Sequence, residues 1–199
     1  MQLQLRDDAE YRIGSDRLID DEEFFEFCAE NRKLRIEREP NGDITIMPPT
    51  GGETSYRNID LASQLHNWAK RDGRGRAFDS NSEFFLPNGA ARGPDAAWVD
   101  KGRLANLTKE QKRKFFYLCP DFVIELTSPS DRLNKVQAKM VEWIANGAAL
   151  GWLIDADKRT VYIYRPGRDP ERLVSVEHAN GEGPVEGFRL DLTDIWLGL

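Results

Sequence analysis

The stretch Phe122-Val123-Ile124-Glu125-Leu126-Thr127-Ser128-Pro129-Ser130 decides the fold, because it predicts a buried strand that ends in a carboxylate and a tight turn. Alternation along this strand places Val123 and Glu125 on one face of a sheet, and Ile124 and Leu126 on the other. A carboxylate in such an apolar strand is costly unless it is paired or binds a metal. A strand-end glutamate in solvent or in a salt bridge is the equally weighted alternative.

A second carboxylate and a lysine accompany Glu125. Gly93-Pro94-Asp95 opens another apolar strand upstream, and proline is tolerated there because a first strand residue need not donate to the ladder. Lys139 lies on the helix after the 121–127 strand, about 90° from the centre of its apolar face, and could reach over the sheet edge. An ordinary flanking lysine is the commoner interpretation. Gln137, on the opposite boundary of that face, is expected in solvent.

The N-terminal third predicts a hairpin between two helices. Asn41-Gly42 separates two alternating stretches, 34–37 and 43–46, which is typical of a β-hairpin. Thr50 and Glu53 fit a capping box, so a helix should begin there and end at Gly73. Its apolar face is predicted at helical spacing, at Ile59, Ala62, Leu65, His66 and Ala69.

Elsewhere the patterns alternate between strand and helix. We expect further helices over 20–28, 108–116 and 133–147, and strands over 76–79, 83–86, 95–99, 150–155 and 161–165. This order predicts an α/β fold in which helices flank a central mixed β-sheet, with an N-terminal β-hairpin. One domain over residues 1–199 is expected, with its core at about 30–195.

Composition narrows the function classes. The 199 residues carry a formal net charge of −6, which argues against indiscriminate binding of nucleic acid over the whole surface. Local basic patches are still allowed, at Lys70, Arg71, Arg74 and Arg76 and at Lys109, Lys112, Arg113 and Lys114. Charge runs on exposed helices are usually just solvated faces, and we favour that interpretation for both.

Several protein classes have no support in the sequence. Cys28 and Cys119 fit neither a disulfide framework nor a zinc motif, so a reducing compartment is expected. We expect no signal peptide, no membrane span and a cytoplasmic location. The two histidines, His66 and His178, offer no convincing triad or zinc pair, and His66 is expected to be packed. Trp98, Trp143 and Trp152 fall in core-like patterns.

These residues carry a resemblance. Pro94-Asp95 followed by Glu125 and Thr127 resembles the PD-(D/E)XK nuclease superfamily, with the usual lysine moved from position 127 to Lys139. More closely, the chain resembles the Uma-type restriction endonuclease family, long filed as a domain of unknown function. The matching stretches are Met47–Glu53, Phe85–Gly89, Gly93–Trp98, Cys119–Leu126 with Ser128-Pro129-Ser130, Gln137–Met140, Gly151–Asp155 and Tyr162–Pro166.

The resemblance implies a restriction-endonuclease-like fold with a metal at Asp95 and Glu125 and a working lysine at Lys139. An acid on the first core helix often joins such a site, which favours Glu53 as a third ligand beside its capping role. Carboxylates hold Mg²⁺, or alternatively Mn²⁺, through oxygen atoms. Such a metal lowers the pKa of a bound water for attack on a DNA phosphodiester. Thr127 is a departure from the superfamily pattern and puts catalysis in doubt if Lys139 does not reach the site.

Three hypotheses follow. The first is a metal-dependent DNA endonuclease, for which a homodimer would be convenient because DNA has two strands. The second is a catalytically silent module on the same fold that binds nucleic acid or protein. The third is an unrelated α/β enzyme with a solvent-exposed Glu125, which a separation of Asp95 and Glu125 above ~8 Å would support, since cation ligands lie at about 2–2.6 Å.

Overall fold

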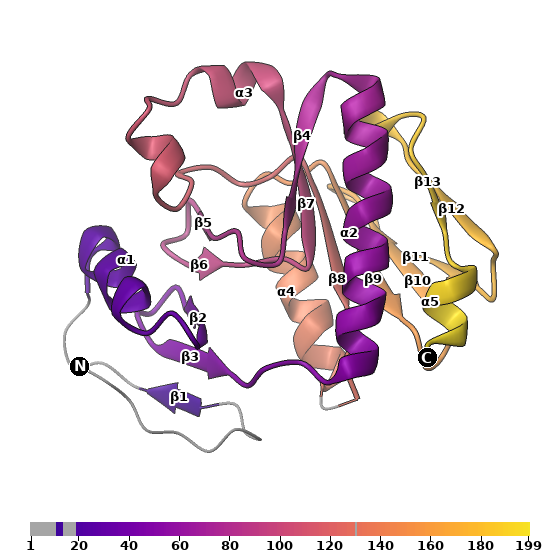
Figure 1. The fold of residues 1–199 in the computed structure, drawn as a ribbon, viewed down its shortest axis with the longest axis horizontal. Helices are drawn as coiled ribbons and strands as arrows, with labels where there is room; N and C mark the ends of the chain where they lie inside the picture. Colours follow the sequence, from indigo (N-terminus) through magenta and orange to yellow (C-terminus); the bar gives the residue numbers. More distant parts are fainter. Residues whose placement is uncertain (1–10, 14–18, 130) are drawn as a thin grey trace.

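A six-stranded mixed sheet forms the centre of the computed structural model, which describes residues 11–13, 19–129 and 131–199 (Figure 1). The strand order is β11-β10-β9-β8-β7-β4. β8 and β9 are parallel, and the other neighbouring pairs are antiparallel. The strands are β4 (Gly75–Asp79), β7 (Ala96–Asp100), β8 (Phe122–Leu126), β9 (Leu150–Asp155), β10 (Thr160–Tyr164) and β11 (Glu171–Val174). The predicted central mixed sheet is confirmed.

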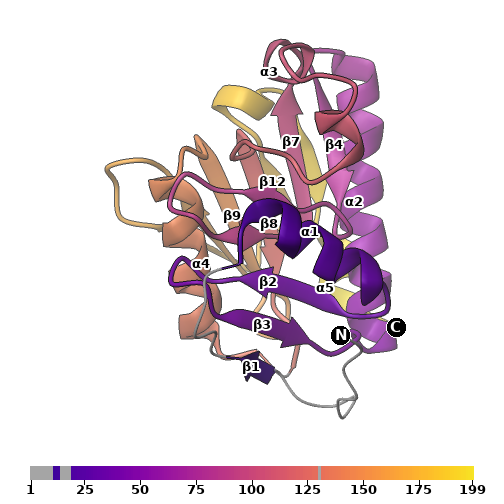
Figure 2. The same ribbon diagram turned by 90° about the vertical axis from the view of Figure 1, so that its left-hand side faces the viewer.

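Two long helices cover opposite faces of this sheet. Figure 1 shows them on either side of the strands, and Figure 2 shows the strands more nearly face-on. α2 (Gly52–Asp72) packs with Ile124 and Leu126 of β8, whereas α4 (Leu133–Ala145) packs with Val123. The alternation predicted for this strand is therefore confirmed. Trp98, Trp143 and Trp152 are buried, as expected for core residues.

A second sheet lies beside the first and contains the predicted hairpin. Its order is β1-β3-β2-β6-β5, and α1 covers the side away from α4 (Figure 1). Gly42, at the hairpin turn, has a positive φ of 88°, which favours glycine. The elements are β1 (Tyr11–Ile13), α1 (Asp21–Glu30), β2 (Arg35–Arg38), β3 (Ile44–Met47), β5 (Phe84–Phe85) and β6 (Ala91–Arg92).

The predicted face of α2 is partly wrong. Ile59 and His66 are exposed, and the buried apolar stripe is Leu61, Leu65, Trp68 and Ala69. Leu61, Leu65 and Trp68 recur at i, i+4 and i+7. Because these side chains are large and apolar, their side of the helix is the one that packs against the sheet. The capping box is wrong too, since Gly51 is the N-cap and makes no side-chain cap bond.

The predicted 108–116 helix is largely wrong. Only Gln111–Arg113 forms a short 3₁₀ turn, after Thr108 and Gln111 exchange hydrogen bonds. A short helix, α3 (Lys101–Ala105), precedes it and was missed because its second residue is Gly102. The tail adds a 3₁₀ turn (Gly183–Val185), β12 (His178–Asn180), β13 (Arg189–Asp191) and α5 (Thr193–Leu197). Ser130 of the predicted Ser-Pro-Ser turn lies outside the described residues. No helix in the described ranges is long and apolar enough to span a bilayer.

Candidate active site

The ends of β7 and β8 bring Asp95 and Glu125 together. Ala96 lies opposite Ile124 in the ladder, so Asp95 and Glu125 occupy the next position along the two strands. Oδ2 of Asp95 accepts a hydrogen bond of 2.8 Å from the backbone N–H of Leu126. The two carboxylate residues are only 6% and 4% exposed. The hypothesis of a solvent-exposed Glu125 is therefore wrong.

Lys139 reaches Glu125 from α4. Its Nζ lies 3.0 Å from Oε1 of Glu125 and 2.8 Å from Oε1 of Glu37, and it donates to the carbonyl oxygen of Gly93 at 3.0 Å. Trp143, one helical turn further along, donates its indole N–H to the same Glu125 oxygen at 2.8 Å. Two cationic or polar donors therefore fix Oε1, and the described residues donate no hydrogen bond to Oε2.

The second sheet also contributes to the site, through the polar face of β2. Arg35 Nη1 lies 3.3 Å from Oδ1 of Asp95, and its Nη2 donates to the Gly93 carbonyl at 2.7 Å. Oε1 of Glu37 accepts from the backbone N–H of Gly93 at 3.1 Å. The sequence analysis assigned neither residue to the site, because alternation along a strand does not show what covers its polar face. Ile36 packs toward α1 instead, so both faces of β2 are covered.

Arg92 fixes the second sheet against α4. Its guanidinium lies 2.6 Å from Oε2 of Glu142 on α4, 2.6 Å from Oε2 of Glu39 and 3.5 Å from Oε2 of Glu37. Because Arg92 and Glu37 are almost completely buried, this network fixes the position of Glu37 next to Lys139.

Burial and neighbouring charges shift the pKa values of the central groups in different directions. Burial raises the pKa of Glu125 to about 7, with Lys139 opposing the shift and Asp95 adding to it. Burial also opposes ionisation of Glu37, but attraction to Lys139, Arg92 and Arg35 outweighs it and lowers the Glu37 pKa. Burial opposes the charged form of Lys139, but Glu125 and Glu37 raise its pKa overall. Lys139 is therefore an ammonium ion at neutral pH.

Glu83 is a further buried carboxyl group at this site. Burial, with the charge of Glu37, raises the pKa of Glu83 well above its ordinary value. Its Oε1 is buried and has no hydrogen-bond partner among the described residues. These surroundings favour the neutral form of Glu83.

The shift at Glu125 predicts a pH-dependent stability. The native state holds the Glu125 proton more tightly than the unfolded chain, so raising the pH from 4.5 to about 7 lowers the free energy of unfolding. Glu125→Gln cannot titrate there. The free energy of unfolding of Glu125→Gln, measured relative to that of the wild type, should therefore rise by up to about 3 kcal/mol as the pH is raised over this range. Urea unfolding in EDTA at pH 5 and pH 7.5 measures this, and a difference independent of pH would contradict the burial argument.

Gly93 brings its backbone close to several site residues. A Cβ added there would lie 2.9 Å from Oε2 of Glu83 and 3.2 Å from the Ser82 carbonyl oxygen. We expect Gly93→Ala to lower the free energy of unfolding by about 1–3 kcal/mol, because backbone and carboxylate must move apart. Gly52→Ala is the matched control, since nothing lies within 4 Å of its added Cβ. Equal stabilities of the two variants in urea unfolding would show that the close approach at Gly93 is unimportant.

Glu53 does not point toward Asp95. Its Oε1 pairs with Arg57 Nη2 at 3.0 Å, and Arg57 donates through Nε to the Ile195 carbonyl of α5. The α2 residue that contacts Asp95 is Asn58, whose Nδ2 lies 3.4 Å from Oδ1. Five residues along a helix correspond to about 140° of rotation, so Glu53 and Asn58 face different ways.

Position 127 supplies no cation to the site. The Thr127 hydroxyl donates to the Ile154 carbonyl at 3.4 Å, as its backbone N–H does at 2.9 Å. Lys139 therefore provides the ammonium next to Glu125 that the superfamily pattern places at position 127.

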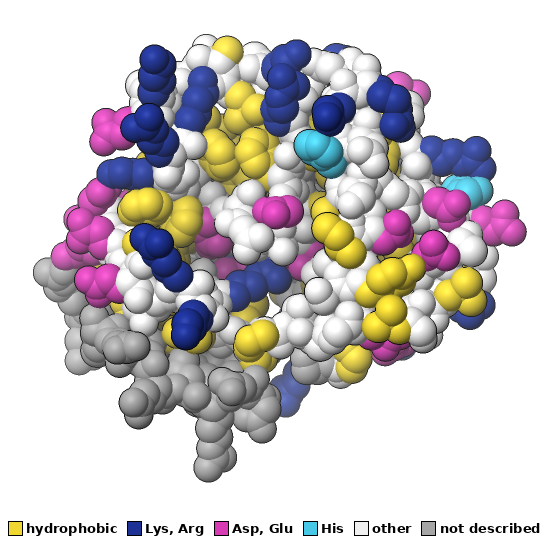
Figure 3. All heavy atoms as spheres, in the orientation of Figure 1, with side chains coloured by type: hydrophobic (Ala, Val, Ile, Leu, Met, Phe, Trp, Pro, Cys, Tyr) yellow, Lys and Arg dark blue, Asp and Glu magenta, His cyan; other side chains and the backbone are white. Residues whose placement is uncertain are grey.

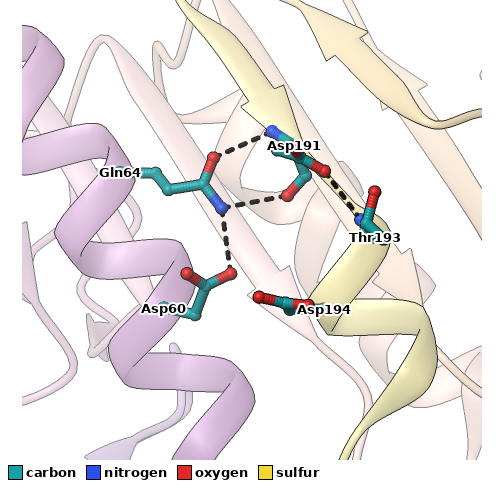
Figure 4. A pocket seen from close by; sticks show the side chains of 5 residues that line it. All are labelled: Asp60, Gln64, Asp191, Thr193 and Asp194. Atoms are coloured by element: carbon teal, nitrogen blue, oxygen red, sulfur yellow. Dashed lines mark hydrogen bonds between the residues drawn. The ribbon is translucent and has the colours of Figure 1, made fainter.

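A surface hollow of about 370 Å³ lies elsewhere, between α2 and the C-terminal elements (Figure 4). Gln64 donates to Asp60 and to the Asp191 carbonyl, both at 2.9 Å, and accepts from the Asp191 N–H at 2.8 Å. Thr193 and Asp194 complete the lining. These hydrogen bonds connect α2 to β13. The hollow that they line does not include Asp95 or Glu125.

The donor set at Asp95 and Glu125 fits a hard divalent cation. Mg²⁺ is commonly bound through one or two carboxylates, with waters and substrate phosphates as the remaining ligands. Glu125 keeps an oxygen that no described residue donates to, next to Asp95. The described residues contain no group of three or more His, Cys, Asp or Glu suited to a metal, so Glu53 does not complete a triad there. Asp95 and Glu125 are the residues that would hold the ion.

The fold of this chain is similar to that of a solved structure. A crystal structure described as a "putative nuclease belonging to DUF820 from Anabaena variabilis ATCC 29413" matches with a TM-score of 0.68 and 23% identity, over 81% of this chain and 89% of that one. The chain belongs to the Uma2 family, described as "Putative restriction endonuclease", whose profile matches residues 21–193. No functionally curated protein matches the chain. Membership of this family supports a nuclease function.

Proposed function

We propose that the protein is a metal-dependent endonuclease that hydrolyses phosphodiester bonds in DNA, with Asp95 and Glu125 as metal ligands and Lys139 as the catalytic cation. The observation that carries this proposal is the buried pair of carboxylates with an ammonium 3.0 Å from Glu125. A buried glutamate of raised pKa beside a second acid is costly to the fold, and functional sites are where such costs concentrate.

A bound Mg²⁺ or Mn²⁺ would supply Lewis acidity that favours deprotonation of the attacking water and offsets charge on the phosphorus. The residues of the chain set up this reaction. Trp143 and Lys139 hold Oε1 of Glu125, which leaves Oε2 for the ion. Lys139 carries its proton at rest and so acts through its charge on the phosphate or the water rather than as a general base. Glu37 and the Gly93 carbonyl keep this ammonium in place.

Arg35 is the second cation available to the substrate. It is 27% exposed, lies beside Asp95 and can meet a phosphate oxygen without leaving the Gly93 carbonyl. Guanidinium groups bind phosphates in a fixed forked geometry, which suits this position. We propose further that the protein works in the cytoplasm and that a homodimer serves two-strand cutting.

One observation favours the second candidate function, a silent nucleic-acid-binding or protein-interaction module. Lys139 already pairs with both Glu37 and Glu125, so these carboxylates have a cationic partner without any metal. In a silent module this ion pair would be the permanent state. In the nuclease, the ion pair would stay in place, and Asp95 and Glu125 would hold the metal.

A cleavage assay separates the two functions. Supercoiled plasmid incubated with the protein and Mg²⁺ or Mn²⁺ is expected to be nicked or linearised, and EDTA should stop the reaction. Glu53→Gln should keep at least half of the wild-type rate, because Glu53 pairs with Arg57 rather than Asp95. Loss of cleavage in a folded Glu53→Gln protein would restore Glu53 to the ligand set. No cleavage by the wild type with either metal would favour the silent module.

A further inference from the structure

Exposed cations from three elements gather at the end of the central sheet opposite to Asp95 and Glu125. Lys70 and Arg71 lie in the last turn of α2, Arg76 lies on β4, and Lys101 begins α3. The fold joins them, because the Lys101 N–H donates to the Arg74 carbonyl at 2.9 Å. We call these four residues the basic rim. Figure 3 shows Lys and Arg side chains along this upper edge, over α3 and the ends of α2 and β4.

The members of the basic rim have no carboxylate partner among the described residues. Arg74, their neighbour, is different, since it pairs with Asp72 at 2.8 Å and donates to the Glu186 carbonyl. The whole chain has a net charge of −6, so the basic rim is a local positive region on a protein that is acidic overall. Such a surface attracts a polyanion even though the protein as a whole is acidic.

The rim is also hollowed. A depression of about 380 Å³ lies between α2 and β4, lined by His66, Lys70 and Arg76 together with Ala69, Gly75 and Ala77. His66, which was expected to be packed, is exposed here. The depression brings the side chains of Lys70, Arg76 and His66, from two elements, to one space, where they can contact phosphate oxygens.

Strand β7 connects the basic rim to the candidate active site, so its length gives the distance between them. β7 runs from Ala96, next to Asp95, to Asp100, next to Lys101. The six steps from Asp95 to Lys101 cover about 20 Å at 3.3–3.4 Å per residue. The same length corresponds to about six base pairs of duplex DNA at 3.4 Å per step.

We propose that the basic rim binds the backbone of the DNA substrate about six base pairs from the phosphodiester at Asp95 and Glu125. The inference rests on the proposed function and adds a second contact region, which holds the duplex without taking part in hydrolysis. A duplex too short to span both regions loses the rim contact. Longer duplexes keep it.

The test measures binding by fluorescence anisotropy, in EDTA so that no cleavage occurs, with a labelled duplex of 24 base pairs and a labelled 4-base-pair duplex whose strands are joined by a non-nucleotide linker. The rim variant is Arg76→Glu/Lys101→Glu. Its matched control is Arg168→Glu/Arg172→Glu, which makes the same charge change at two exposed arginines on and beside β11, the opposite edge strand. Thermal unfolding of each variant checks that it is folded.

We expect the rim variant to bind the 24-base-pair duplex at least tenfold more weakly than the wild type, and the control less than threefold. The slope of log affinity against log salt should fall by about two, for two lost phosphate contacts. The wild-type preference for the longer duplex should shrink in the rim variant. Equal losses in the two variants, or an unchanged length preference, would overturn the proposal.

The outcome is separable from that of the proposed function. Rim-dependent binding of the duplex by a protein that cuts no DNA would uphold the rim and refute the nuclease. Metal-dependent cleavage that requires Asp95, together with duplex binding that ignores the rim substitutions, would do the reverse.

Discussion

Asp95→Asn is expected to reduce metal-dependent DNA cleavage by at least about 10³-fold, since a catalytic metal supplies several kcal/mol and each 1.36 kcal/mol is tenfold in rate. Asparagine keeps the size of the side chain and an oxygen that can accept from the Leu126 N–H, which lies 2.8 Å from Oδ2 in the wild type. What it loses is the charge that a hard cation requires. Single-turnover cleavage of a labelled duplex measures the effect.

The control for this prediction is the stability of the variant. Because the backbone hydrogen bond to residue 95 can persist, the thermal unfolding midpoint should stay close to that of the wild type. A folded Asp95→Asn protein that cleaves at more than a tenth of the wild-type rate would show that the hydrolysis occurs at another place. Loss of cleavage with loss of folding would call for Asp95→Glu, which keeps the charge and should retain metal binding.

Lys139→Met is expected to reduce cleavage by about 10²–10³-fold, the usual cost of removing one group that stabilises charge in the transition state. The same change leaves Glu37 and Glu125 buried without their ammonium, and breaking a buried ion pair costs about 3–5 kcal/mol of stability. Loss of activity in this variant alone could therefore reflect misfolding.

A double variant separates the two effects. Lys139→Met/Glu37→Gln removes one cation and one carboxylate, so the net charge of the buried cluster is unchanged. We expect it to recover most of the lost stability in urea unfolding and none of the lost cleavage. Recovery of cleavage with stability would mean that Lys139 serves the fold only. Glu37→Gln alone, which keeps the ammonium near Glu125, should show an intermediate cleavage rate.

The strongest sequence patterns predicted the fold well. The apolar β8 strand, the amphipathic α4 helix and the Asn41-Gly42 hairpin each form where periodicity or turn chemistry placed them. Local patterns failed where tertiary packing decided the outcome. His66 and Ile59 match a helical apolar spacing, but the face of α2 that carries the larger side chains of Leu61, Leu65 and Trp68 is the buried one.

The site was predictable only in the parts that stand out along the chain. Glu125 is conspicuous as a charge in an apolar strand, and Asp95 follows a strand-opening proline. The structure places Glu125 beside Lys139 and Asp95 next to Glu125. Arg35 and Glu37 are polar residues of an alternating hairpin strand, and nothing along the chain marks them as site residues. Their burial depends on a second sheet that Arg92 and Glu142 fasten to α4, a contact between residues 50 positions apart. Asn58 lay in a helix whose orientation had to be known first.

The most direct test of a metal site at Asp95 and Glu125 is a calorimetric titration of the purified protein with Mg²⁺ and Mn²⁺, in parallel with Asp95→Ala and Glu125→Ala. We expect saturable binding to the wild type that is lost in both variants. The indole N–H resonance of Trp143, which donates to Glu125, should shift with the same saturation curve. Binding that survives both substitutions, or that leaves the Trp143 signal unmoved, would contradict a metal site at Asp95 and Glu125.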